Sequence, residues 1–239
     1  MRFSPLILLL PLIFLLPDVL AAQDYNGPRT GYGISLFPHL ANRRLAAANS
    51  ISFEEIDRIE EREVAAFGYA AGLFFRNRSL KLGYDTGLNY LVSGYDTQRG
   101  PVDAGGPRPG FSEYSETFVT RQIELPFAIQ FYQQVDDANE FSFSLGLAVS
   151  YALDQRTEYT GFNTAGSQTF EINEDVSYRA ANYAFMAGFG YNRRFGTDWA
   201  VLLQPTFKYW FRGLIDDEEA ELNRNLYMVG FKTVFMRVR

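Results

Sequence analysis

The sequence contains no cysteine and only one histidine. The absence of cysteine excludes disulfide scaffolds, thiolate zinc sites, thiol nucleophiles and lipidation of an N-terminal cysteine. Basic residues are also in the minority, because 22 Lys and Arg stand against 28 Asp and Glu, for a net charge of -6. A chain without a basic excess does not neutralise phosphates well, so we expect no nucleic-acid partner.

Long hydrophobic runs are missing after the first residues. Residues 6–16 are almost wholly apolar, follow Met1-Arg2 and precede Leu20-Ala21-Ala22. This layout is typical of a secretory signal peptide, so we predict that residues 1–22 are removed and that residues 23–239 form one domain. The run is shorter than the ~20 residues of a membrane helix, and no later stretch is longer. If the remaining chain enters a membrane, it must do so as a closed barrel, because lipid cannot satisfy an open sheet edge.

Aromatic residues and glycine are abundant, with 22 Phe, 15 Tyr and 20 Gly. In residues 141–153 the odd positions are bulky and apolar, whereas the even positions are Ser, Gly or Ala. The same division recurs in residues 66–75, 80–92 and 183–192. A period of two is the pattern of a β-strand with two different faces. Eight strands are predicted, at about residues 29–40, 63–76, 79–95, 116–132, 140–154, 177–195, 198–213 and 224–237.

Short and long connections alternate strictly between these strands. The short ones are Asn77-Arg78, residues 133–139 and Gly196-Thr197. The long ones are rich in Gly, Pro, Asp, Glu or Asn and comprise residues 41–62, 96–115, 155–176 and 214–223. Even strand number, short turns at one end and long loops at the other are typical of bacterial outer-membrane barrels. The prediction is an all-β fold, an eight-stranded antiparallel up-and-down transmembrane β-barrel with short periplasmic turns and long outer loops.

Volume determines which face of each strand points outward. The interior of an eight-stranded barrel is just wide enough for side chains to fill, so the Gly, Ala and Ser face must be inside. The bulky face then contacts outer-membrane lipid, since a soluble protein does not expose so much aromatic surface. Sandwich and lipocalin-type soluble barrels are the alternatives, and the latter needs the polar face outside. Rings expected in the interface girdles are those of Phe131, Phe141, Trp199, Tyr209, Phe211 and Tyr227.

Three segments resemble a known family. Residues 122–132 contain Glu124-Leu125-Pro126 and are similar to the "E-(I/L)-P" strand of the PorT-like small outer-membrane β-barrel family. Residues 80–90 and Phe189-Gly190-Tyr191 are similar to its third and sixth strands. The resemblance implies an eight-stranded barrel in the bacterial outer membrane, without catalytic residues. Some members are linked to protein secretion, which implies envelope or secretion-complex proteins as partners.

Any site is expected in the lumen, where parity places a small set of charges. Glu124 and Lys208 lie at similar distances from their periplasmic turns, so we predict an ion pair between them at mid-barrel. We interpret the network as a structural plug, and a proton- or ion-conducting path is the alternative. Pro126 lacks an N–H and predicts a bulge or kink next to Glu124. The predicted lumen charges are Lys81, Asp85, Glu124, Lys208, Arg212 and Lys232.

The sequence does not favour an enzyme, and no catalytic, cofactor or metal site is predicted. His39 is expected at the outer rim of the first strand, where a catalytic base is improbable. Ser52-Phe53-Glu54-Glu55 has the form of a capping box and predicts a short helix in the first outer loop. We therefore expect a structural, binding or secretion-accessory role exerted through the outer loops. A narrow channel for ions or small solutes is the alternative function.

Overall fold

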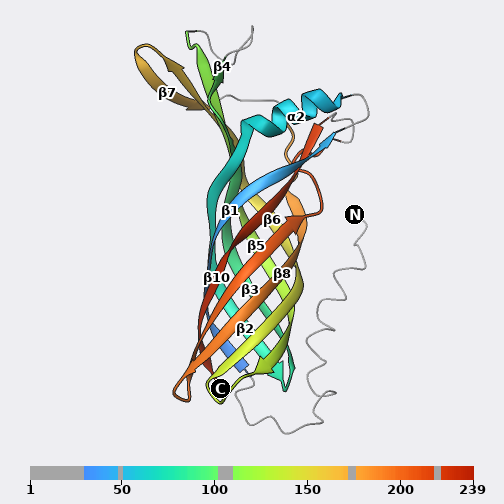
Figure 1. The fold of residues 1–239 in the computed structure, drawn as a ribbon, viewed down its shortest axis with the longest axis vertical. Helices are drawn as coiled ribbons and strands as arrows, with labels where there is room; N and C mark the ends of the chain where they lie inside the picture. Colours follow the sequence, from blue (N-terminus) through green and yellow to red (C-terminus); the bar gives the residue numbers. More distant parts are fainter. Residues whose placement is uncertain (1–29, 48–50, 102–109, 172–175, 218–221) are drawn as a thin grey trace.

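The computed structural model describes residues 30–47, 51–101, 110–171, 176–217 and 222–239 (Figure 1). The predicted signal segment, residues 1–22, lies outside the described residues. One helix and ten strands occur in the described part of the chain. In chain order they are β1 (Thr30–Ala47), α2 (Phe53–Arg62), β2 (Glu63–Ser79), β3 (Leu82–Thr97), β4 (Gly100–Pro101), β5 (Glu113–Gln134), β6 (Asn139–Asn163), β7 (Gly166–Glu171), β8 (Ala181–Phe195), β9 (Trp199–Trp210) and β10 (Leu222–Val238).

The eight long strands form a closed ring. Each of β1, β2, β3, β5, β6, β8, β9 and β10 pairs antiparallel with its neighbours in chain order, and β1 pairs with β10 to close the barrel. Thr30 and Arg239 exchange two backbone hydrogen bonds of 3.0 and 2.9 Å at the closure. The predicted up-and-down barrel is confirmed. The end with the short connections is called the turn end, and the opposite end the loop end (Figure 1).

The two faces of the strands are arranged as the volume argument requires. Bulky apolar side chains point outward, for example Leu40, Leu147 and Phe189, which are 56%, 55% and 70% exposed. The predicted girdle rings lie at the two ends of this surface, with Trp199 at the turn end and Tyr209 at the loop end of β9. A tilted strand of 12 residues such as β9 spans about 30 Å, enough for the ~25 Å apolar band of a membrane barrel.

The first hairpin turn lies three residues later than predicted. Asn77 and Arg78 pair with Tyr84 and Gly83 in the ladder, so the turn is Leu80-Lys81, with Leu80 at φ 44°. Arg78 stays in the strand because its guanidinium bonds Glu140 at 2.5 Å and lies over the Tyr132 ring. No Gly or Asn marks Leu80-Lys81, and the partners that hold Arg78 come from distant strands. Local turn signals therefore pointed to the wrong dipeptide.

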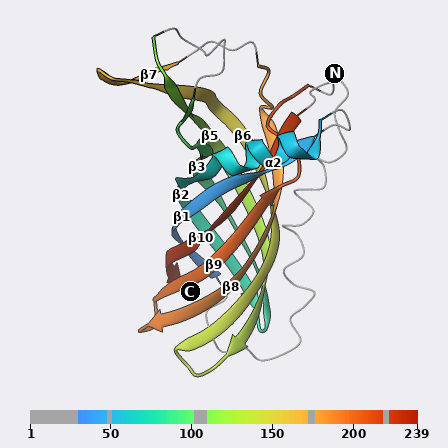
Figure 2. The ribbon, with the colours of Figure 1, turned by 45° about the horizontal axis from the view of Figure 1, so that its top comes forward.

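Strands extend into two of the predicted outer loops, residues 96–115 and 155–176. β5 and β6 are 22 and 25 residues long, and they continue beyond the barrel to pair with β4 and β7. Figures 1 and 2 show this projecting sheet above the ring. We call it the arm, and it consists of residues 100–101, 111–116, 158–163 and 166–171. Aromatic side chains stabilise one face of the arm: the ring centroids of Phe111 and Tyr114 lie 5.7 Å apart, and those of Phe111 and Phe170 lie 5.8 Å apart.

The first outer connection contains the predicted helix. Ser52 caps α2, because its Oγ accepts a hydrogen bond from the Glu55 N–H at 3.3 Å. Glu54 and Glu55 in the first turn and Arg62 in the last turn complement the helix dipole. Within the described residues, no helix is both long and apolar enough to cross a membrane. The helix instead crosses the loop end beside β1 (Figure 2).

Pro126 changes the ladder without adding a residue. In the ladder with β3, Thr86 pairs with Phe127 and Asn89 pairs with Glu124 in the same register. Leu125 and Pro126, which lie between these pairs, have no ladder partner in β3. The bulge in β5–β6 lies elsewhere, because the register shifts between Arg121 and Gln122. At Pro126 the structure therefore has no bulge. The hydrogen bonding with β3 is interrupted there, but the register is the same on both sides of the interruption. The missing N–H explains the interruption.

The turn between β5 and β6 allows a prediction about acid stability. The Asp136 carboxylate accepts hydrogen bonds from the backbone N–H groups of Ala138 and Asn139 and from the Asn139 side chain, at 2.8 to 2.9 Å. These bonds hold the pKa of Asp136 below its usual value. A depressed folded-state pKa stabilises the fold above the unfolded pKa of about 4, and this contribution disappears as pH falls through the folded pKa. We expect Asp136→Ala to lower the urea midpoint slightly at neutral pH and by less at about pH 2. An equal deficit at both pH values would contradict this.

Candidate functional site

The middle of the lumen is crossed by an ion pair. Lys208 on β9 donates hydrogen bonds to both carboxylate oxygens of Glu124 on β5, at 2.7 and 2.5 Å. Their side chains are 4% and 1% exposed. Asn89 donates weakly to Glu124 at 3.5 Å and accepts from Ser35 at 2.9 Å. Strands β5 and β9 are not neighbours in the ring, so this pair ties opposite walls together.

A small cavity of about 30 Å³ lies beside this pair. Lys232 on β10 also lines the cavity, and its Nζ lies 5.0 Å from the centre of the Phe74 ring. Among the described residues Lys232 has no ion-pair partner. A cavity of this size has room for ordered water but not for a larger solute.

A second polar network closes the turn end of the lumen. Arg76 binds Asp85 with two hydrogen bonds of 2.8 and 2.9 Å and reaches across the lumen to Asn192 at 2.8 Å. Gln130 donates to the same aspartate at 2.8 Å, and Asn192 donates to Ser142 at 3.1 Å. Bidentate Arg–carboxylate pairs of this kind are the strong ones. The network satisfies its charges internally and fills the space between five strands.

An apolar layer closes the loop end of the lumen. Leu91, Phe118, Trp210 and Leu226 are each at most 1% exposed and belong to one cluster. The rings of Phe118 and Tyr95 stack with centroids 5.3 Å apart. The lumen is thus closed at three levels, by an apolar layer, the Glu124–Lys208 pair and the Arg76–Asp85 network.

Two of the predicted lumen charges lie outside the lumen. Lys81 is exposed in the turn between β2 and β3, because that turn is shifted to Leu80-Lys81. Arg212 is exposed beyond the end of β9, which stops at Trp210 rather than at residue 213. Parity arguments do not apply to residues outside a strand. Asp85, Glu124, Lys208 and Lys232 are placed in the lumen by the structure, and parity along β2 was the signal that could have added Arg76 to them.

His39 is inside the lumen and not at the rim, which corrects the prediction. It is 2% exposed, its Nδ1 lies 3.0 Å from the Phe37 carbonyl oxygen, and its ring stacks on that of Phe37. Its Nε2 lies 3.2 Å from Oγ of Ser93, which is 3% exposed. A Ser–His pair is the beginning of a nucleophilic site. Here, however, a carbonyl and not a carboxylate orients the imidazole, and the apolar layer separates the pair from the loop end.

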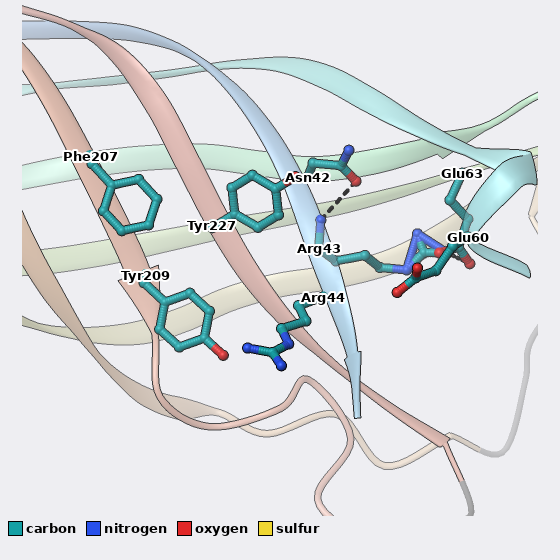
Figure 3. Close-up of a pocket in the computed structure, with 8 residues that line it drawn as sticks. All are labelled: Asn42, Arg43, Arg44, Glu60, Glu63, Phe207, Tyr209 and Tyr227. Atoms are coloured by element: carbon teal, nitrogen blue, oxygen red, sulfur yellow. Dashed lines mark hydrogen bonds and ion pairs between the residues drawn. The ribbon is translucent and has the colours of Figure 1, made fainter. Parts of the chain in front are cut away.

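A pocket of about 600 Å³ lies at the loop end on the outer wall of the barrel. Figure 3 shows Arg43 pointing toward Glu60 and Glu63, whereas Arg44 points toward Tyr209. Arg43 is buried, forms an ion pair with Glu63 and lies over the Tyr95 ring at 3.9 Å. The sequence did not indicate this site, because its residues belong to five different elements. The residues of this rim pocket are Asn42, Arg43, Arg44, Glu60, Glu63, Phe207, Tyr209 and Tyr227.

Comparison with known families agrees with this architecture. A family model described as "Outer membrane protein beta-barrel domain" matches residues 45–217. The chain belongs to this outer-membrane barrel family. As an outer-membrane barrel, it has its turn end in the periplasm and its loop end at the cell surface. The arm and the rim pocket are therefore features of the surface side, and the Arg76–Asp85 network is a feature of the periplasmic side.

Two solved structures of other proteins are similar to this barrel at low sequence identity. Ail, the attachment invasion locus protein of Yersinia pestis, solved in complex with the heparin analogue sucrose octasulfate, is 8% identical, with 87% of this chain and 99% of that chain covered and a TM-score of 0.33. Neisserial surface protein A is 9% identical, with 87% and 97% covered and a TM-score of 0.39. Among curated proteins, none matches this outer-membrane barrel by sequence.

Proposed function

We propose that this outer-membrane barrel is a closed barrel that acts as a binding protein at the cell surface, through its arm and loop-end rim. The closed lumen is the observation that carries the proposal. A transport role requires a path, and three successive layers of side chains fill the interior of the described barrel. A closed barrel leaves its exposed ends as the places where function can be exerted.

The arm has the properties of a preorganised binding element. Its aromatic face is packed, since Tyr114 and Tyr159 are only 5% and 7% exposed although they lie outside the barrel. At the base of the arm, Arg156 pairs with Glu158 at 2.9 Å and with Glu171 at 3.5 Å. A rigid element loses little entropy when it binds a partner. This is why we place the binding role on the arm.

The proposed partners follow from the same surfaces. Outer-membrane lipid covers the apolar wall, and an envelope protein is the partner proposed for the arm. The resemblance to the PorT-like family supports a secretion-complex protein as that partner, by analogy alone. The alternative function, a narrow channel, requires the Glu124–Lys208 pair to open.

Ion conductance in planar bilayers distinguishes the closed barrel from the channel. We expect no steady current from the wild type, because the lumen is closed by buried ion pairs. Glu124→Ala and Lys208→Ala should each introduce a leak, since an unpaired buried charge draws water into the lumen. A steady current from the wild type would overturn the closed-barrel proposal and favour the channel.

Photo-crosslinking in cells tests which end of the barrel contacts a partner. A photoreactive residue at Thr169 of the arm is compared with one at Asp137 of the periplasmic turn, each in an otherwise unchanged protein. A specific adduct from Thr169 alone supports a role at the cell surface. An adduct from Asp137 alone would contradict the proposal and place the partner in the periplasm.

A further inference from the structure

The rim pocket lies where the lipid-facing wall changes from apolar to charged. The ladder places three rows of outward-facing side chains above one another across β9, β10 and β1. The lowest row consists of Phe207, Val229 and Leu40, which are 40%, 55% and 56% exposed. The next row toward the loop end consists of Tyr209, Tyr227 and Asn42, and above it Asn225 pairs with Arg44. This order of apolar, amphipathic and cationic groups matches the order of acyl chain, interface and charged headgroup in a lipid.

Arg44 is available for a ligand. Its side chain is exposed, and among the described residues its guanidinium has no hydrogen bond or ion pair. The other arginine of the pocket is already used, because Arg43 is buried against Glu63. Glu63 also lies 3.7 Å from Arg224, so its charge is balanced within the protein. The outer part of the pocket therefore presents one free guanidinium beside Tyr209 (Figure 3).

We propose that the rim pocket binds the phosphate of an outer-leaflet glycolipid, with Arg44 as the phosphate ligand. A guanidinium binds phosphate oxygens with two parallel N–H donors, and a lysine cannot reproduce this geometry. Tyr209 and Tyr227 offer hydroxyl groups at headgroup depth and ring faces below it. Glu60, exposed on α2, can accept hydrogen bonds from sugar hydroxyls. Phe207 contacts the first part of an acyl chain. This site is on the barrel wall and does not depend on the role proposed for the arm.

Native mass spectrometry of the protein purified from outer membranes in mild detergent tests this site. The probes are diphosphoryl lipid A, the same glycolipid without its phosphates, and inorganic phosphate. We expect the wild type to retain diphosphoryl lipid A, and Arg44→Gln to weaken binding about tenfold or more. The affinity of Arg44→Lys for diphosphoryl lipid A should lie between those of the wild type and Arg44→Gln. The matched control is Arg58→Gln, which removes the same charge from α2 at a side chain that is 71% exposed and outside the pocket.

Three outcomes would overturn the proposal. Equal binding of the glycolipid without phosphates would show that the phosphate is not recognised. Equal losses in Arg44→Gln and Arg58→Gln would show a general charge effect. Displacement of the lipid by inorganic phosphate at a similar concentration would show a site for soluble anions. Heat-modifiable electrophoretic mobility confirms that each variant is folded before its binding is compared.

Discussion

Replacing Glu124 by Ala should destabilise the barrel by about 3–5 kcal/mol, because the change leaves the Lys208 ammonium buried without its partner. In the wild type, the Glu124 carboxylate accepts two hydrogen bonds from Lys208, at 2.7 and 2.5 Å. No other group in the described part of the lumen can replace both of these bonds. Lys232, which lines the same cavity, adds a second positive charge nearby. The variant must therefore neutralise a lysine or admit water. Equilibrium unfolding in urea from lipid vesicles measures the loss.

Two control variants separate this effect from other causes. Glu171→Ala removes an arm carboxylate that is 60% exposed and pairs with Arg156, so its cost should be at most about 1 kcal/mol. The double variant Glu124→Gln, Lys208→Met removes both lumen charges at similar side-chain volume. It should recover most of the stability, because no unpaired charge remains buried. A double variant as unstable as the sum of its single changes would contradict this account.

Replacing Trp210 by Ala should cost about 3–5 kcal/mol, the loss typical of a large aromatic core residue. Trp210 is 1% exposed and belongs to the apolar layer that closes the loop end. The substitution leaves a cavity between rigid strands that cannot collapse. Trp210→Phe should cost only about 1 kcal/mol, because the indole Nε1 has no hydrogen-bond partner among the described residues. A large loss in Trp210→Phe would show that the N–H has a partner.

Fluorescence distinguishes this tryptophan from the second one in the chain. Trp199 is 43% exposed on the outer wall, where it stacks on Phe235 with ring centroids 4.8 Å apart. Brominated lipids should quench Trp199 and leave Trp210 unquenched. Trp199→Phe and Trp210→Phe variants assign each signal, and quenching of Trp210 would contradict its place in the lumen.

Much of the barrel could be predicted because alternation is a local property. In β6, Leu145 and Leu147 alternate with small residues such as Ser144 and Ser150. This alternation shows which face of the strand contacts lipid without any knowledge of the neighbouring strands. The same reasoning led to the eight strands and to Glu124 and Lys208 as inward charges. It failed at strand ends, as with Arg212, because the pattern does not say where hydrogen bonding stops.

The sequence by itself determined the outward and inward faces, the number of barrel strands and the end to which the long connections belong. Only the tertiary structure decided the turn at Leu80-Lys81, the burial of His39, the extension of β5 and β6 into the arm, and the partners of Arg76. The reason is that these features depend on how the strands are staggered against one another when the barrel closes. Arg76 meets Asn192 across 116 residues of sequence, and such contacts depend on the register of the whole ring rather than on any one strand.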